Sequence, residues 1–263
     1  MKTKLLLFSL VLICFASCND TKEFLPEDNS MTRSELINDE VEMREYSIKE
    51  PYEFPVKPGT PQWASFTSWL EMYESSQISE DILTDITTEA LAETCLSYPL
   101  AFDFLYANDE LLRISQTIAD FNGLNELSKR EGGAKCLVDE YEKLDKFAIN
   151  RPPHYIIKES YSILAYAELL LSNDVFFTKL NEEDLRHLYE VTSTKLEYKL
   201  NNIDYFSYVD LKKSLLLNSK IRLKVDKNIS PKEKECLINF IRDYNNVTVD
   251  ELEIVSRVAN VMK

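Results

Sequence analysis

Residues 154–171 read HYIIKESYSILAYAELLL, and this stretch decides the fold. Only Lys158, Glu159 and Glu168 are charged in it, so apolar side chains occupy most of the circumference of a helix over these residues. A surface helix keeps one apolar stripe, whereas a helix that is apolar on nearly every side must be covered by other elements. The stretch therefore predicts the most buried helix of the protein.

The chain beyond Pro61 has the pattern of further helices. Its only glycines are Gly123, Gly132 and Gly133, and apolar residues recur three and four positions apart. Such spacing is typical of amphipathic helices. We expect an all-α protein, arranged as an irregular multi-helix bundle or a short array of antiparallel helix pairs. No fixed repeat period is found, so a solenoid is the second choice.

Pairs of polar residues three positions apart mark where helices begin, because each side chain can accept a hydrogen bond from the backbone of the other. The pairs are Asn181 with Asp184, Ser230 with Glu233, and Thr248 with Glu251. Other helices are expected over residues 61–73, 87–97, 99–107, 109–121, 133–144 and 207–217. Residues 221–225 alternate apolar and basic side chains, and we expect a loop or a helix end there.

Proline-rich and acidic stretches divide the chain. Asn150-Arg151-Pro152-Pro153 is the clearest internal break and suggests helical subdomains over residues 61–149 and 150–263, although one continuous domain fits as well. Residues 18–60 are acidic and end in repeated prolines, which remove backbone donors and favour extended structure. This segment is interpreted as a flexible tether.

The N-terminus has the layout of a secretory signal peptide over residues 1–17. Lys2 and Lys4 precede a largely apolar run of twelve residues, from 5 to 16, and small residues follow. A membrane-spanning helix needs about 20 apolar residues, so the run is too short for one. The ending Phe15-Ala16-Ser17-Cys18 resembles the lipobox of bacterial lipoproteins.

The lipobox resemblance implies cleavage before Cys18 and acylation of that cysteine, with palmitate among the chains, so the membrane would be a partner through the lipid. Phe15 stands where the family usually has leucine, and an ordinary signal peptide with a chance cysteine is the alternative. The expected location is the cell envelope, anchored to the outer membrane. Asn19 and Asp20, with Lys22 and Glu23, resemble a surface-export signal or form a plain polar linker, so the side of the membrane stays open.

A second resemblance covers residues 87–145. It is carried by 93–100 (ETCLSYPL), by 121–127 (FNGLNEL) and by the helix pattern over 133–141. These segments resemble a helical region of exported bacterial proteins of unassigned function. The resemblance implies kinship without catalytic residues.

Composition excludes one class of partner. The chain carries 45 acidic and 30 basic side chains, a net charge of −15 at neutral pH. Such a surface repels phosphate backbones, so nucleic-acid binding is not expected. Cys95, Cys136 and Cys236 would follow a cleaved signal peptide and Cys18; they are too few for a disulfide framework, and one bridge or buried thiols are both open.

No catalytic, cofactor or metal motif is found in the sequence. His154 and His187 are the only histidines, and His187 has Glu183 and Glu190 on its predicted helix face. We interpret this group as a surface histidine among solvated carboxylates and expect neither a metal nor a cofactor. The stretch 132–135 (GGAK) lacks the ending of a phosphate loop and is interpreted as a helix start.

Aromatic residues are dense between 150 and 210, and tyrosine serves cores and binding surfaces alike. Tyr205, Phe206 and Tyr208 lie near a predicted helix junction, where they would form a patch for a protein or glycan partner. We therefore expect a lipid-anchored binding or interaction module of the bacterial envelope. The alternative is an envelope or surface hydrolase that cleaves glycans or other polymers through paired carboxylates.

Overall fold

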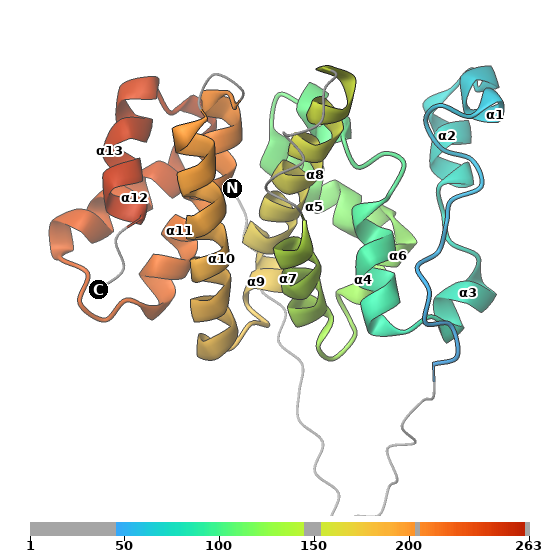
Figure 1. Cartoon of the computed structure of the whole chain (residues 1–263), viewed down its shortest axis with the longest axis horizontal. Helices are drawn as coiled ribbons and strands as arrows, with labels where there is room; N and C mark the ends of the chain where they lie inside the picture. Colours follow the sequence, from blue (N-terminus) through green and yellow to red (C-terminus); the bar gives the residue numbers. More distant parts are fainter. Residues whose placement is uncertain (1–45, 145–153, 203–205, 261–263) are drawn as a thin grey trace, which may run out of the picture. The chain divides into compact units, whose positions relative to one another are not determined.

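The computed structural model describes residues 46–144, 154–202 and 206–260, with side chains of the helix that begins at His154 described from Ile163 onward. These residues belong to one compact unit, Glu45–Lys263 (Figure 1). Its α-helices are α1 Pro61–Ser65, α2 Trp69–Ser75, α3 Glu80–Asp85, α4 Thr88–Leu96, α5 Glu110–Asp120, α6 Asn122–Leu127, α7 Gly133–Lys143, α8 His154–Ser172, α9 Asp174–Phe177, α10 Glu182–Asn201, α11 Tyr208–Val225, α12 Pro231–Arg242 and α13 Val249–Ala259. Two 3₁₀ helices are η1 Asp103–Tyr106 and η3 Tyr244–Asn246.

The all-α fold class is confirmed for the part of the chain that the structure describes. One isolated parallel bridge, between Ile48 and Ile86, is the nearest approach to a strand among these residues. None of the helices there combines the length and the apolar character that crossing a bilayer requires. The signal peptide, Cys18 and the first part of the predicted tether lie outside the described residues.

Helix α8 lies at the centre of the packing, as its sequence predicts. Every side chain from 164 to 172 is buried, so this part of the helix is covered on all sides. It contacts α4, α5 and α7, which precede it in the sequence, and α9 and α11, which follow it. A run of Leu, Ala and Tyr with a single charge, at Glu168, accounts for this position.

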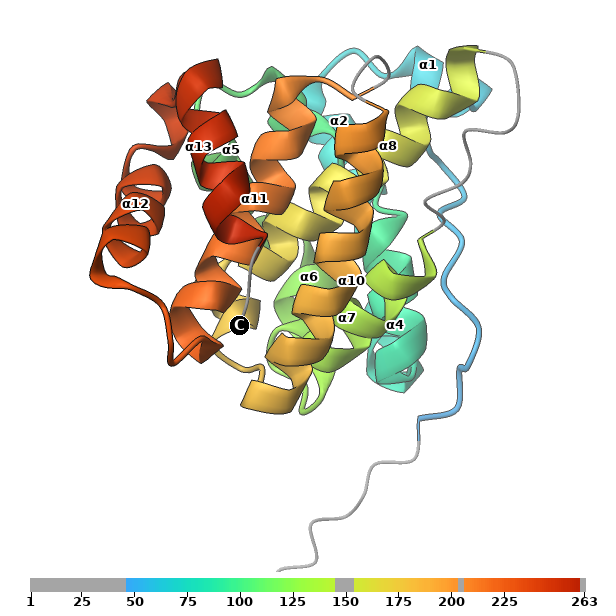
Figure 2. The same ribbon diagram turned by 60° about the vertical axis from the view of Figure 1, so that its left-hand side comes forward.

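Helix α11 shares the centre, although its sequence is more polar. It packs against α8, α10, α12 and α13 (Figure 2). Residues 213–219 are buried without interruption, and they include a lysine, two serines and an asparagine. Helix α10 runs antiparallel to it, since Lys199 meets Ser214 and Arg186 meets the Val225 carbonyl. Hydrogen bonds, rather than apolar contacts alone, therefore join the two helices.

One apolar core continues across the predicted subdomain break. It runs from Phe54 to Ala259 and joins α4, α5 and α7 to α8. The described residues therefore fit the single-domain alternative, and the break at 150–153 itself lies outside them.

The predicted tether needs a correction at its C-terminal end. Residues 46–60, which we call the strap, pack on the helical body. The Ile48 N–H donates to the Asp85 carbonyl over 2.9 Å, and the Tyr52 N–H donates to Thr94 Oγ1 over 2.8 Å. Phe54 is buried against the rings of Tyr98 and Phe121. Prolines prevent a helix here without preventing an extended segment from burying its apolar side chains.

Arg130 fastens the strap and α3 to the rest of the core. Its guanidinium donates to the carbonyls of Ile86 and Leu83 over 2.6 and 2.7 Å, and it pairs with Glu126 at 3.0 Å. The same group lies 4.5 Å from the centre of the Tyr46 ring. One buried side chain thus binds three separate segments.

The glycines at 132 and 133 start a helix. Gly132 has a φ of +73°, which favours glycine, and it is the residue before α7. A Cβ on Gly133 would come 2.2 Å from the Leu127 carbonyl oxygen, so only glycine fits this close approach. The prediction of a helix over 133–144 is confirmed.

Several predicted helix limits are right and others are wrong. The capping boxes at Asn181, Ser230 and Thr248 are all formed. The helix expected over 61–73 is two helices, because Ser68 and Glu71 form a further capping box that begins α2. Residues 99–107 contain only η1, and the alternating residues 221–225 are the last turn of α11.

Candidate binding pocket

Two residues of the predicted aromatic patch, Phe206 and Tyr208, are described by the structure, and they do not share a surface. Phe206 is buried and packs edge-on against Tyr198, with ring centres 6.0 Å apart. Tyr208 is exposed at the start of α11, and Tyr205 lies outside the described residues. The prediction that Phe206 belongs to an exposed patch is therefore wrong, because Tyr198 on the preceding helix covers its ring.

His187 has a partner that the sequence pattern did not suggest. Its Nε2 lies 3.0 Å from Glu142 Oε2 on α7, and both side chains are about half exposed. No group of three potential metal-binding side chains occurs within the described ranges. The histidine and Glu142 form a surface contact between two helices.

The three cysteines that the structure describes are free thiols. Cys95 is fully buried, and burial raises its pKa well above the ordinary value. Burial also raises the pKa of Cys136, to about 11, and that of Cys236. Protonated thiols are weak nucleophiles, so thiol catalysis gains no support. The alternative of a disulfide among these cysteines is not realised.

Four helices bring ionisable side chains together in what we call the polar centre: Tyr141, Glu168, Lys199 and Ser214. Lys199 Nζ donates to both Glu168 oxygens, over 2.9 and 2.8 Å, and to Ser214 Oγ over 2.8 Å. Ser214 and Tyr141 donate to Glu168 Oε1 over 2.7 and 3.0 Å. Each helix of the group α7, α8, α10 and α11 supplies one member.

The polar centre has the residue types of a serine–lysine catalytic pair but not its arrangement. Ser214 donates a hydrogen bond to the Glu168 carboxylate and accepts one from Lys199, so the lysine is not placed to act as a base on the hydroxyl. Burial and the Glu168 carboxylate raise the pKa of Tyr141 well above its usual value. The Lys199 and Glu168 side chains are 1% and 0% exposed, which leaves no access for a substrate. This cluster holds helices together.

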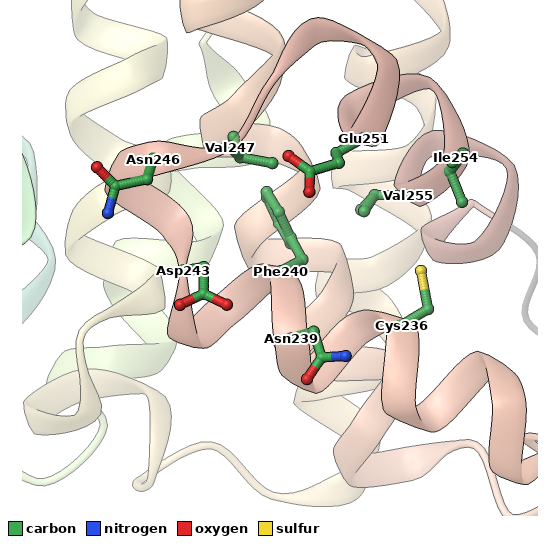
Figure 3. A pocket seen from close by; sticks show the side chains of 9 residues that line it. All are labelled: Cys236, Asn239, Phe240, Asp243, Asn246, Val247, Glu251, Ile254 and Val255. Carbon is green, nitrogen blue, oxygen red and sulfur yellow. The ribbon is translucent and has the colours of Figure 1, made fainter.

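An open pocket lies between α12 and α13, and it is the candidate functional site (Figure 3). Its volume is about 370 Å³, within the range of small-ligand pockets. Phe240 and Val255 are buried at its floor, while Cys236 and Val247 are half buried along its walls. Exposed residues form its rim: Asn239, Asp243, Asn246, Glu251 and Ile254.

Local sequence explains how this pocket forms. The cap of α12 is at Asp243, and η3 then turns the chain before Thr248 begins α13. The connection brings the two helices into contact while Tyr244 is buried toward α5, where its hydroxyl donates to Glu110 over 2.6 Å. Of the η3 side chains, Tyr244 packs edge-on against Phe240, with ring centres 6.0 Å apart, and Asn246 lines the pocket.

The rim of the pocket is negatively charged. Hydrogen bonds from the backbone N–H and hydroxyl of Thr248 lower the pKa of Glu251, so this carboxylate is ionised at neutral pH. The negative charge of Asp243 opposes ionisation of Glu251, although its effect on the pKa is smaller than that of these hydrogen bonds, so the two carboxylates interact electrostatically. Arg242 pairs with Asp243 at 3.2 Å, but both side chains are more than 60% exposed, so the pair is weak.

Glu251 does not match the general acid of a glycosidase. A general acid needs a raised pKa so that it is protonated at working pH. The pKa of Glu251 is lowered instead. The arrangement suits binding better than proton transfer.

Comparison of the chain with protein-family models, with curated protein sequences and with solved structures found no match.

Proposed function

We propose that this protein is an exported binding module of the bacterial cell envelope, anchored to the outer membrane through lipid on Cys18, with the pocket between α12 and α13 as its binding site. The signal-peptide layout of residues 1–17 and the lipobox-like ending support the anchor. Two or three acyl chains hold a protein on a bilayer far more firmly than one. The partner is a protein or glycan segment that inserts a side group into the pocket.

The observation that carries this proposal is the contrast in access. The buried carboxylate of the polar centre is satisfied by neighbouring side chains, whereas the pocket is open to solvent and has apolar side chains in its lining. Pockets of this kind bind a ligand by covering the apolar floor, and the few polar groups at the rim set its orientation.

Co-purification from mildly crosslinked, detergent-solubilised envelopes tests the proposal. The tagged full-length protein is compared with Cys18→Ala, which lacks the anchor, and with Ile254→Trp, which fills the pocket mouth. Ile238→Trp is the matched control, because Ile238 is a similarly exposed isoleucine on α12 that does not line the pocket.

We expect a stoichiometric partner with the wild type and with Ile238→Trp. Its recovery falls at least about tenfold with Ile254→Trp, because the tryptophan ring occupies the mouth of the pocket and keeps the partner's side group out. The membrane fraction should lose the Cys18→Ala protein. Recovery of the protein alone, or equal recovery with both tryptophan variants, would overturn the assignment of the pocket.

A further inference from the structure

The dimensions of the pocket limit what can enter it. A volume of about 370 Å³ holds roughly a dozen groups of the size of a water molecule. Phe240 lies across the floor and Val255 beside it, with the Cys236 sulfur on the same side (Figure 3). The half-buried Cys236 and Val247 and the exposed Ile254 supply most of the apolar area that an aromatic or branched aliphatic group can cover above this floor. A long acyl chain or an extended polymer exceeds the space.

The polar groups of the rim add a second requirement. Asp243 and Glu251 carry negative charge, while Asn239 and Asn246 are neutral amides. No basic side chain lines the pocket among the described residues, and Arg242, the last residue of α12, forms only a weak, exposed ion pair with the rim residue Asp243 at 3.2 Å. An entering carboxylate or phosphate would meet two like charges, whereas an ammonium or guanidinium would meet two opposite ones.

We propose that the pocket binds a compact apolar group that carries a positive charge: an aromatic or branched aliphatic amine or guanidine, presented on a partner or free. This inference rests on the proposed function and deepens it. The apolar part lies on Phe240 and Val255, and the cation lies between Asp243 and Glu251. Recognition then needs both parts, because each alone leaves either the apolar lining uncovered or the rim carboxylates without a cation inside the pocket.

Three probes of similar size separate the two requirements. Phenethylamine, phenethyl alcohol and phenylacetate share a phenyl ring and differ in charge. Each is titrated into the purified full-length protein in detergent by ligand-observed NMR, and Ile254→Trp in the same detergent measures binding outside the pocket. The double variant Asp243→Asn with Glu251→Gln removes the rim charge while glutamine keeps the capping geometry at Thr248.

The matched control is Asp250→Asn with Glu253→Gln. These exposed carboxylates lie on α13, which also carries Glu251, and they do not line the pocket. The control changes the net charge by the same amount as the rim double variant. We expect phenethylamine to bind about tenfold more tightly than the alcohol, and the rim double variant to remove that preference. The control variant should keep it, and added salt should weaken it.

Three outcomes would overturn the inference: equal binding of amine and alcohol, tighter binding of phenylacetate, or a preference for the amine that persists in the rim variant or in Ile254→Trp. The proposed function fails separately. If Ile254→Trp loses its envelope partner but the amine binds no more tightly than the alcohol or phenylacetate, only the inferred class of ligand is wrong. If the amine binds as expected and no partner is recovered, the inference about the ligand is supported and the proposed envelope complex is contradicted.

Discussion

The polar centre and the pocket between α12 and α13 both contain carboxylates, but they use them in opposite ways. Glu168 is fully buried and accepts hydrogen bonds from Lys199, Ser214 and Tyr141. Asp243 and Glu251 stand at the edge of an open space and face no basic side chain across it in the described structure. The polar centre, with its dense ionisable side chains, therefore joins helices, whereas the two carboxylates of the pocket rim leave room for a ligand.

The largest effect should follow from breaking the polar centre. Glu168→Ala leaves the Lys199 ammonium buried without its counter-ion, and loss of one member of a buried pair costs about 3–5 kcal/mol of unfolding free energy. Urea denaturation measures the loss, with the exposed Glu197→Ala on α10 as the control. A change below about 1 kcal/mol would mean that the cluster is not a structural joint.

A smaller but still substantial loss is expected at the strap. Phe54→Ala removes a buried ring from its contacts with Tyr98 and Phe121, and a truncation of this kind costs about 3 kcal/mol. The neighbouring Glu53→Ala should be nearly neutral because Glu53 is exposed. Denaturation curves that coincide for both variants would show that the strap adds nothing to the core.

Glu233 is an intermediate case, a partly exposed carboxylate with protein partners. Hydrogen bonds from Ser230 and from the Arg222 guanidinium lower its pKa from about 4.5 to about 2. Because the folded-state pKa is the lower one, the stabilisation is complete above about pH 4.5 and is lost as pH falls toward 2.

Glu233→Gln should therefore melt at a lower temperature than the wild type at pH 6, and the difference should shrink as the pH falls from about 4.5 to 2. Thermal melts across this range measure the effect. A difference that does not change with pH would assign the loss to the shape of the cap instead of its charge.

The smallest effect is expected at the pocket. Replacing Asp243 with Asn and Glu251 with Gln should change the melting temperature by no more than about 2 °C, since both side chains are exposed and glutamine still serves the capping box. The contrast with Glu168→Ala is the test: a large loss at the rim would mean that these carboxylates are structural too.

Local rules predicted the parts of the fold that depend on neighbours in sequence. The three capping boxes follow from hydrogen bonds within four residues, and the burial of residues 164–172 follows from a run with one charge. The split between α1 and α2 was missed, although Ser68 and Glu71 carry the same signal. The apolar residues Trp63 to Tyr73 suggested one continuous stripe and hid it.

Long-range pairing explains what the sequence did not reveal. Glu168 is a lone charge in an apolar run, and its partners Tyr141, Lys199 and Ser214 come from three other helices. The burial of the strap likewise depends on aromatic residues more than forty positions away. No local pattern records these contacts.

The pocket could be predicted only in part. Phe240 and Val255 are buried residues of α12 and α13, the two helices whose starts were predicted from the capping pairs at Ser230 and Thr248. Whether two stripes meet closely or leave a hollow depends on the length and turn of the connection through η3. The choice of Tyr205, Phe206 and Tyr208 as a patch failed at Phe206 for the same reason, because aromatic content does not tell which ring is covered.

The strap has a mechanical consequence. A pull on the chain ahead of Tyr46 first meets the contact between the Tyr46 ring and Arg130, and then Ile48, whose N–H and carbonyl bond to Asp85 and Thr87 on either side of Ile86. Tension then reaches the Phe54 ring inside the core before it reaches α1. The parallel pairing at Ile48 and the buried ring would have to yield before any helix unwinds, so the protein would resist being drawn toward a surface better than one that is held by its first helix.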